Sequence, residues 1–124
     1  MKRAVSEPVC CPAQPAAKKL ADEGIQAEVI DPRTVAPLDL DTILKSVAKT
    51  GRLVLVDQAP RHATVASAIA GDVAEHGFSS LKAPIVQVNA RDATVPYSEP
   101  LEAYVIPDEE RIVAAVRTVL KARR

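Results

Sequence analysis

Residues 52–78 read RLVLVDQAPRHATVASAIAGDVAEHGF, and the fold can be predicted from this stretch. Residues 53–56 form a continuous apolar run that is too short for a helix, and such a run is typical of a parallel strand covered on both faces. An acidic, proline-containing turn follows, after which apolar residues recur every four positions at Val65, Ile69 and Val73. The stretch therefore predicts a strand, a loop and a helix.

The rest of the chain continues this alternation of helix and strand. Helices are predicted over 16–23, 39–50, 63–76 and from 108 onward, and strands over 25–30, 53–56 and 85–88. Gln87 places the last strand near a sheet edge, and residues 89–107, which contain three prolines, are predicted to form a long irregular connection. The order of elements indicates an α/β fold of three layers, with a mostly parallel sheet and helices on both faces.

The beginning of the chain does not fit this alternation. Pro8, Pro12 and Pro15 favour neither a central strand nor a helix interior, so residues 1–15 are interpreted as an irregular N-terminal arm before a domain at 16–124. A doubly wound unit has a strand before its first helix. The sheet is therefore predicted to lack its first strand.

Composition limits the kinds of partner. The chain has 124 residues and 48% hydrophobic content, which suits one small domain. A net charge of +0 and an aromatic content of 2% argue against nucleic acid as a partner. The adjacent Cys10 and Cys11 are poorly placed for a mutual disulfide and lack the spacing of a metal site. No signal peptide or membrane span is indicated, and a cytoplasmic location is predicted.

Two aspartates are candidates for ligand chemistry. Asp31 and Asp57 each follow a predicted strand, and the carboxyl ends of parallel strands form the ligand crevice of many α/β proteins. Aspartates at such positions more often bind loop amides or cap the following helix, and this interpretation is favoured. His62 lies in the same loop without a nucleophile motif, so it gives no evidence of a general base.

Four segments of the chain resemble a known family. EVIDPRTVAPLD at 28–39, GRLVLVDQAPR at 51–61, LKAPIVQV at 81–88 and VPYSEPLE at 95–102 are similar in residues and spacing to the C-terminal domain of 2-oxo acid dehydrogenase β-subunits. That family includes the β-chains of pyruvate, branched-chain 2-oxo acid and acetoin dehydrogenases. The resemblance extends from residue 16 to the end of the chain. It implies a transketolase C-terminal-like fold.

The resemblance also implies that the chain serves a larger enzyme. The parent oxidoreductase uses thiamin diphosphate and magnesium, which are held mainly by the α-subunit, and its β-subunit has a preceding pyrimidine-binding domain. Catalysis by this chain alone is therefore not expected, and no catalytic, cofactor-binding or metal-binding residue is assigned to it. The implied partners are the α-subunit, a second β-subunit and the lipoyl acyltransferase core, and a homo-oligomer is a further possibility.

The first hypothesis is accordingly an assembly domain of a dehydrogenase β-subunit that supports subunit association and docking to the acyltransferase core. Its candidate interface residues are Gln58, Arg61, His62, Lys82, Tyr97, Lys121 and Arg124. One alternative is a free-standing module that binds a small ligand near Asp31, Asp57 and Asn89. Another is a non-functional gene remnant, an interpretation that depends on the missing strand and on the absence of the preceding domain.

Overall fold

A computed structural model describes residues 2–6, 12–62 and 64–122. Its strands are β1 (Lys2–Ser6), β2 (Gln26–Ile30), β3 (Leu53–Pro60) and β4 (Val86–Ala90), and its helices are α1 (Ala13–Asp22), α2 (Leu40–Thr50), α3 (Val65–His76), α4 (Glu99–Val105) and α5 (Glu109–Lys121), with a 3-10 turn at Phe78–Ser80. The strands form one parallel sheet in the order β2-β1-β3-β4. The predicted three-layer α/β fold is confirmed, and β4 lies at an edge as Gln87 indicated.

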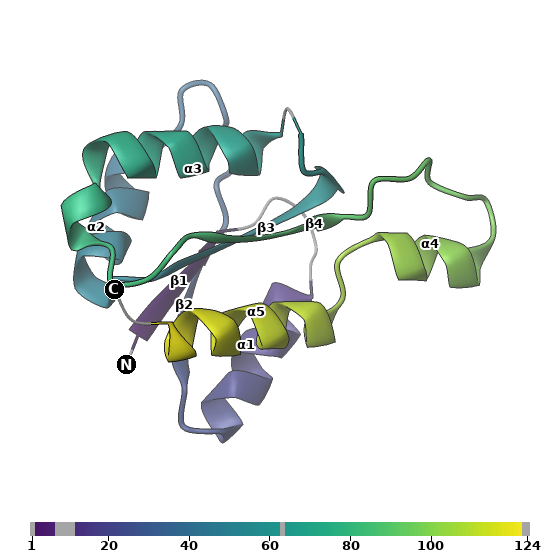
Figure 1. Cartoon of the computed structure of the whole chain (residues 1–124), viewed down its shortest axis with the longest axis horizontal. Coiled ribbons are helices and arrows are strands. Elements are labelled where there is room, and N and C mark those ends of the chain that lie inside the picture. The colour runs from purple at the N-terminus through teal and green to yellow at the C-terminus, as the bar shows by residue number, and fades with distance from the viewer. Residues whose placement is uncertain (1, 7–11, 63, 123–124) are drawn as a thin grey trace.

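Strand β3 divides the hydrophobic core in two. Leu53 and Leu55 pack with residues of α2 and α3, whereas Val54 and Val56 pack with residues of α1 and α5. Figure 1 shows these two pairs of helices on opposite faces of the sheet. All four side chains are at most 3% exposed. Burial of an aliphatic side chain of this size contributes roughly 1.5–3 kcal/mol. The continuous apolar run is explained because both faces of β3 are covered.

Helix α2 begins and ends where local signals predicted. The Asp39 carboxylate accepts a hydrogen bond from the Thr42 backbone N–H at 3.1 Å, and a second from the Thr42 hydroxyl at 2.6 Å. These hydrogen bonds lower the pKa of Asp39 below its usual value, the side-chain bond having the larger effect. Gly51 ends the helix with φ 71°, a left-handed conformation that glycine adopts without strain.

The structure corrects the interpretation of the N-terminal residues as an irregular arm. Strand β1 pairs in parallel with β2, from Lys2 opposite Gln26 to Ser6 opposite Ile30, and with β3 on its other side. The sheet thus has the strand before α1 that the sequence was predicted to lack. Pro12 is the N-cap of α1, and Pro15 lies in the first turn of that helix, where proline is tolerated. Pro8, Cys10 and Cys11 lie outside the described residues.

The connection after β4 was also predicted incorrectly. Residues 89–107 were expected to be irregular, but β4 continues to Ala90 and α4 occupies Glu99–Val105. Pro100 does not break α4, since it lies in the first turn, whose N–H groups have no intrahelical acceptor. In Figure 1, α4 projects beyond the carboxyl end of β4 and away from the layers that the other helices form with the sheet.

Candidate functional site

The carboxyl ends of β3 and β4 lie side by side at one edge of the sheet. Asp57 pairs in register with Asn89, and their exposed fractions are 8% and 5%. Burial of two polar side chains at this edge requires hydrogen-bond partners. Those partners show what the two residues do.

Asp57 has a structural role. One carboxylate oxygen accepts a hydrogen bond from the Ala59 N–H at 2.9 Å, and the other accepts one from the Ala66 N–H at 3.2 Å. The side chain therefore joins the end of β3 to the first turn of α3. Thr64 caps the same helix by accepting a hydrogen bond from the Ser67 N–H at 3.2 Å. The favoured interpretation of Asp57, as a residue that binds loop amides and supports a helix start, is confirmed.

Asn89 lies where three segments meet. Its side-chain amide donates to the Ala59 carbonyl at 3.3 Å, and its own backbone carbonyl accepts a hydrogen bond from Arg111 at 2.6 Å. Arg111 also donates to the Ile106 carbonyl at 3.3 Å. The Oδ1 atom of Asn89 is buried and has no hydrogen-bond partner.

Sequence analysis did not identify Arg111. The available signal was its position, because a cation in the first turn of a helix opposes the helix dipole and needs another reason to be there. That reason is the pair of backbone carbonyls that its guanidinium binds.

Asp31 does not join the other two residues of the ligand-binding alternative. It follows β2, and β1 lies between β2 and β3. Its carboxylate pairs with Arg33 at 3.2 Å on the surface. It borders a separate hollow of ≈ 270 Å³ lined by Ile30, Asp31, Pro32, Arg33, Thr34, Asp39, Thr42 and Ile43. Since both Asp57 oxygens already accept backbone hydrogen bonds, the three residues do not form one ligand site.

The candidate interface residues divide between opposite edges of the sheet. Four of them are exposed at the carboxyl edge: Gln58 in the last part of β3, Arg61 and His62 after it, and Tyr97 after β4. Arg124 is outside the described residues.

Lys82 and Lys121 are exposed near the amino edge. The Lys82 N–H donates to the Gly51 carbonyl at 2.7 Å, just before β3. Near the end of α5, the Val119 carbonyl accepts a hydrogen bond from Arg52 at 3.0 Å. The candidates therefore form two surfaces and not one.

The most exposed apolar surface lies at the carboxyl edge, on residues 92–106, which we call the α4 arm. Val95, Tyr97, Leu101 and Tyr104 have exposed fractions of 54%, 108%, 55% and 62%. Val105 is the one buried residue within the arm. Several large apolar side chains exposed on one short segment are typical of a binding surface.

Arg91 holds the base of the α4 arm. Its backbone N–H donates to the Val105 carbonyl at 2.9 Å, and its guanidinium donates to the Tyr104 carbonyl at 3.0 Å. The same guanidinium lies 4.0 Å from the centroid of the Tyr104 ring. The arm therefore has a defined attachment to the domain although its outer face has no cover from the described residues.

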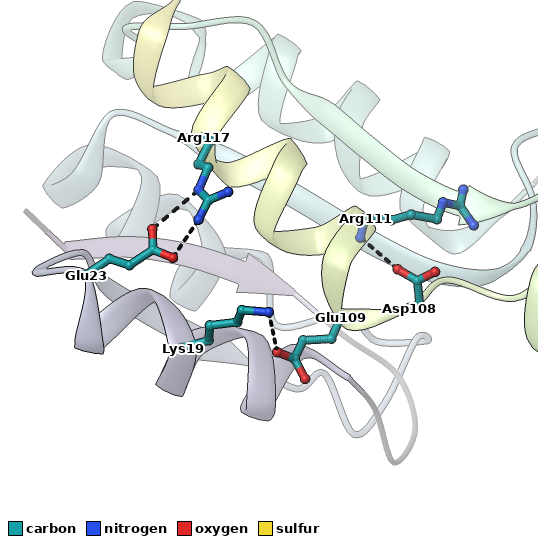
Figure 2. Close-up of polar contacts among 6 residues, drawn as sticks. All are labelled: Lys19, Glu23, Asp108, Glu109, Arg111 and Arg117. Atoms are coloured by element: carbon teal, nitrogen blue, oxygen red, sulfur yellow. Dashed lines mark hydrogen bonds and ion pairs between the residues drawn. The ribbon is translucent and has the colours of Figure 1, made fainter.

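Figure 2 shows polar contacts of α1 and α5. Arg117 binds the Glu23 carboxylate through two nitrogens, at 2.5 and 3.3 Å, and Lys19 pairs with Glu109 at 3.5 Å. Asp108 accepts a hydrogen bond from the Arg111 N–H at 2.7 Å and so caps α5. The two ion pairs join the α1 region to α5, whereas the Asp108 cap lies within α5. These side chains therefore serve the fold.

The described residues do not fit a magnesium diphosphate site. Among them, no group of three or more His, Cys, Asp or Glu side chains is placed to hold a metal ion. Asp57 is the candidate carboxylate at the strand ends, and each of its oxygens accepts a hydrogen bond from a backbone N–H group. Within the same residues, no helix has the length and apolar character needed to cross a bilayer.

Comparison with known proteins gives the family. Residues 8–112 match the model of the transketolase C-terminal domain. The chain is 47% identical over 106 residues to the β-subunit of acetoin:2,6-dichlorophenolindophenol oxidoreductase from Cupriavidus necator, covering 86% of this chain and 31% of that protein. It is 40% identical over 106 residues to the pyruvate dehydrogenase E1 component subunit β from Bacillus subtilis, covering 86% of this chain and 32% of that protein.

A solved structure described as a split gene transketolase, inactive β4 tetramer, is similar over 99% of this chain and 40% of its own, with a TM-score of 0.83 and 28% identity. The chain spans about a third of the length of the two curated relatives. The resemblance to dehydrogenase β-subunits is confirmed, because the relatives carry those names and match most of this chain. The chain belongs to the transketolase C-terminal domain family.

Proposed function

We propose that this chain is the C-terminal assembly domain of the β-subunit of a 2-oxo acid dehydrogenase decarboxylating component. The observation that carries the proposal is the α4 arm, whose exposed Val95, Tyr97 and Leu101 form an apolar surface without cover from the described residues. Such a surface suits a contact with another subunit. The similarity to β-subunits of two dehydrogenases supports the same role.

In this role the domain supports catalysis without performing it. Thiamin diphosphate and Mg²⁺ are bound by other parts of the enzyme, chiefly the α-subunit, and supply the decarboxylation chemistry there. The carboxyl edge of this domain instead presents a rigid surface, because Asp57 and Arg111 form hydrogen bonds with backbone groups there. One of the two observations behind the gene-remnant alternative, the missing strand, no longer applies, because β1 pairs with β2 before α1.

The amino edge is proposed to serve the second partner, the lipoyl acyltransferase core. Lys82 and Lys121 are exposed there. Two exposed cations near one edge favour a partner surface that carries acidic groups. In this proposal the carboxyl edge binds other subunits, and the amino edge binds the acyltransferase core.

A chimera tests the proposal. The matching C-terminal third of the Cupriavidus necator β-subunit is replaced by this chain, and the chimera is produced with the α-subunit. We expect an α–β complex by size-exclusion chromatography and acetoin-dependent reduction of dichlorophenolindophenol, whereas a β-subunit truncated before the domain gives neither. The isolated chain mixed with the α-subunit should show no turnover. A well-folded chimera that does not bind the α-subunit contradicts the proposal.

A further inference from the structure

We propose that Arg91 is the positioning residue of the α4 arm, and that its guanidinium sets the direction in which Tyr104 and the rest of α4 meet another subunit. The inference rests on the proposed role in subunit association. It adds to that role the residue that orders the binding surface before a partner is bound. Such ordering raises affinity, because less conformational freedom is lost on binding.

The base of the α4 arm is fixed through backbone carbonyls. The Arg91 backbone N–H donates to the carbonyl of the buried Val105 at 2.9 Å. From α5, the Arg111 guanidinium donates to the carbonyls of Asn89 and Ile106, at 2.6 and 3.3 Å. None of these three hydrogen bonds uses the Arg91 side chain. The base of the arm therefore keeps its attachment when that side chain is changed.

The outer part of the arm has local hydrogen bonds. The Ala93 N–H donates to the Arg91 carbonyl at 2.8 Å, and the Leu101 and Glu102 N–H groups donate to the Ser98 carbonyl at 3.0 and 2.8 Å. These hydrogen bonds join near neighbours in the sequence. Helix α4 has 7 residues, far below the length at which an isolated helix is stable in water. It therefore needs a contact with the domain to keep its direction.

The Arg91 side chain supplies this contact. Its Nε donates to the Tyr104 carbonyl at 3.0 Å, and its Cζ lies 4.0 Å from the centroid of the Tyr104 ring. A cation at this distance over an aromatic ring is attracted by the electrons of the ring face. The guanidinium thus binds both the backbone and the side chain of one residue in the last turn of α4.

Tyr104 is held in place and remains accessible. Its exposed fraction is 62%, although the guanidinium lies over its ring. Leu101, three residues earlier in the helix, is 55% exposed. Side chains three residues apart lie on the same side of a helix, so a fixed Tyr104 also fixes the direction of Leu101. An ordered, exposed aromatic side chain is suited to anchor an interface.

The positioning role is separable from the stability of the domain. Arg91 is an exposed residue, and its hydrogen bond to Tyr104 also lies at exposed positions. Loss of the side chain therefore leaves no buried donor or acceptor without a partner. We expect its removal to loosen α4 while the core is unchanged.

Hydrogen–deuterium exchange of the full chain tests the ordering of the arm. Arg91→Met removes the charge and the donors but keeps an unbranched side chain. Amide exchange in residues 99–105 should become about fivefold faster, because the loss of an exposed cation–π contact corresponds to a change of that order. Exchange in α5 should not change. Arg91→Lys keeps a cation near the ring and should give an intermediate rate.

A double-mutant cycle identifies the contact between the two side chains. Tyr104→Leu should accelerate exchange in α4 by less than Arg91→Met does, since the hydrogen bond to the Tyr104 carbonyl remains. In the Arg91→Met background, Tyr104→Leu should add nothing, because the ring has already lost its cation. Arg33→Met changes an exposed arginine outside the arm, and this matched control should leave exchange in α4 unchanged.

The chimera with the Cupriavidus necator β-subunit tests the consequence for assembly. Arg91→Met should raise the dissociation constant of its complex with the α-subunit about fivefold. Arg91→Lys should recover part of this loss, and Arg33→Met should cause none. The melting temperature of the chimera should be the same in all three variants, which a merely structural role of Arg91 would not allow.

Four outcomes overturn the inference. They are unchanged exchange in α4 of Arg91→Met, equal acceleration in α4 and α5, an additive double variant, and a chimera whose affinity for the α-subunit does not depend on Arg91. The last outcome leaves the proposed function intact. A chimera that does not bind the α-subunit, beside an Arg91→Met chain whose α4 exchanges faster, refutes the proposed function and supports the ordering of the arm by Arg91.

Discussion

The last two helices of the chain differ in what holds them in place. Helix α5 has 13 residues and buries Ile112, Val116 and Val119 against the sheet layer. Helix α4 has 7 residues and buries Val105 alone. They are separated by three residues, yet one is part of the core and the other lies outside it. The difference indicates that α5 stabilises the domain, and it supports the proposal that α4 contacts a partner.

The largest expected difference comes from truncating one apolar side chain on each helix. Ile112 is 1% exposed, whereas Leu101 is 55% exposed. Ile112→Ala should lower the free energy of unfolding by about 2–5 kcal/mol, because it removes buried methyl groups and leaves a cavity. Leu101→Ala should change it by less than about 0.5 kcal/mol. Urea unfolding followed by circular dichroism, at concentrations where the chain is monomeric, measures both.

Equal losses for the two variants would show that α4 packs on the domain in solution. The comparison between the helices would then fail, and the apolar surface of the arm would no longer be available to a partner.

A smaller effect is expected at the end of β3, where the Asp57 side chain binds backbone groups. Asp57→Ala removes the acceptor for the Ala59 and Ala66 N–H groups. Leaving buried donors unpaired should lower the free energy of unfolding by about 1–3 kcal/mol. Gln58→Ala, at an exposed neighbour, is the matched control and should change it little. Chemical unfolding of the two variants gives the difference. A neutral Asp57→Ala would remove the structural role given to this carboxylate.

The contrast between α4 and α5 also shows which parts of the fold can be predicted from sequence. Strand β3 and helix α2 have strong local signals, namely a continuous apolar run and an Asp39 cap with Gly51 at the end. Strand β1 has none, because KRAVS shows no apolar run and its structure depends on pairing with β2 and β3, which are distant in sequence. Local patterns cannot report such pairing.

The candidate site was predictable to a similar extent. Gln58, Arg61, His62 and Tyr97 were selected separately, and the structure brings them to one edge because parallel strands end together. Lys82 and Lys121 lie at the other edge, a division that requires the topology. Helix α4 was missed because Pro96 and Pro100 suggested an irregular segment. Pro100 instead occupies a first-turn position that proline tolerates.

The smallest effect tests the same two helices at their first residues. Asp108 caps α5 by accepting a hydrogen bond from the Arg111 N–H at 2.7 Å, whereas Ser98, at the corresponding position of α4, makes no side-chain cap hydrogen bond. Asp108→Ala should therefore lower the free energy of unfolding by about 1 kcal/mol. Ser98→Ala should leave it within about 0.3 kcal/mol of the wild type, since no cap bond is lost.

Both residues are exposed, so neither substitution creates a cavity. The pair of variants therefore measures the effect of the cap hydrogen bond without an effect of core packing. Thermal unfolding by differential scanning calorimetry resolves the difference as a few degrees in Tm for a domain of this size. If Ser98→Ala is as destabilising as Asp108→Ala, the start of α4 contributes to the cooperative unit and the arm is not energetically separate. If Asp108→Ala alone lowers Tm, the stability of the domain depends on α5 and not on α4. An outer helix that the core does not stabilise then depends on what it binds.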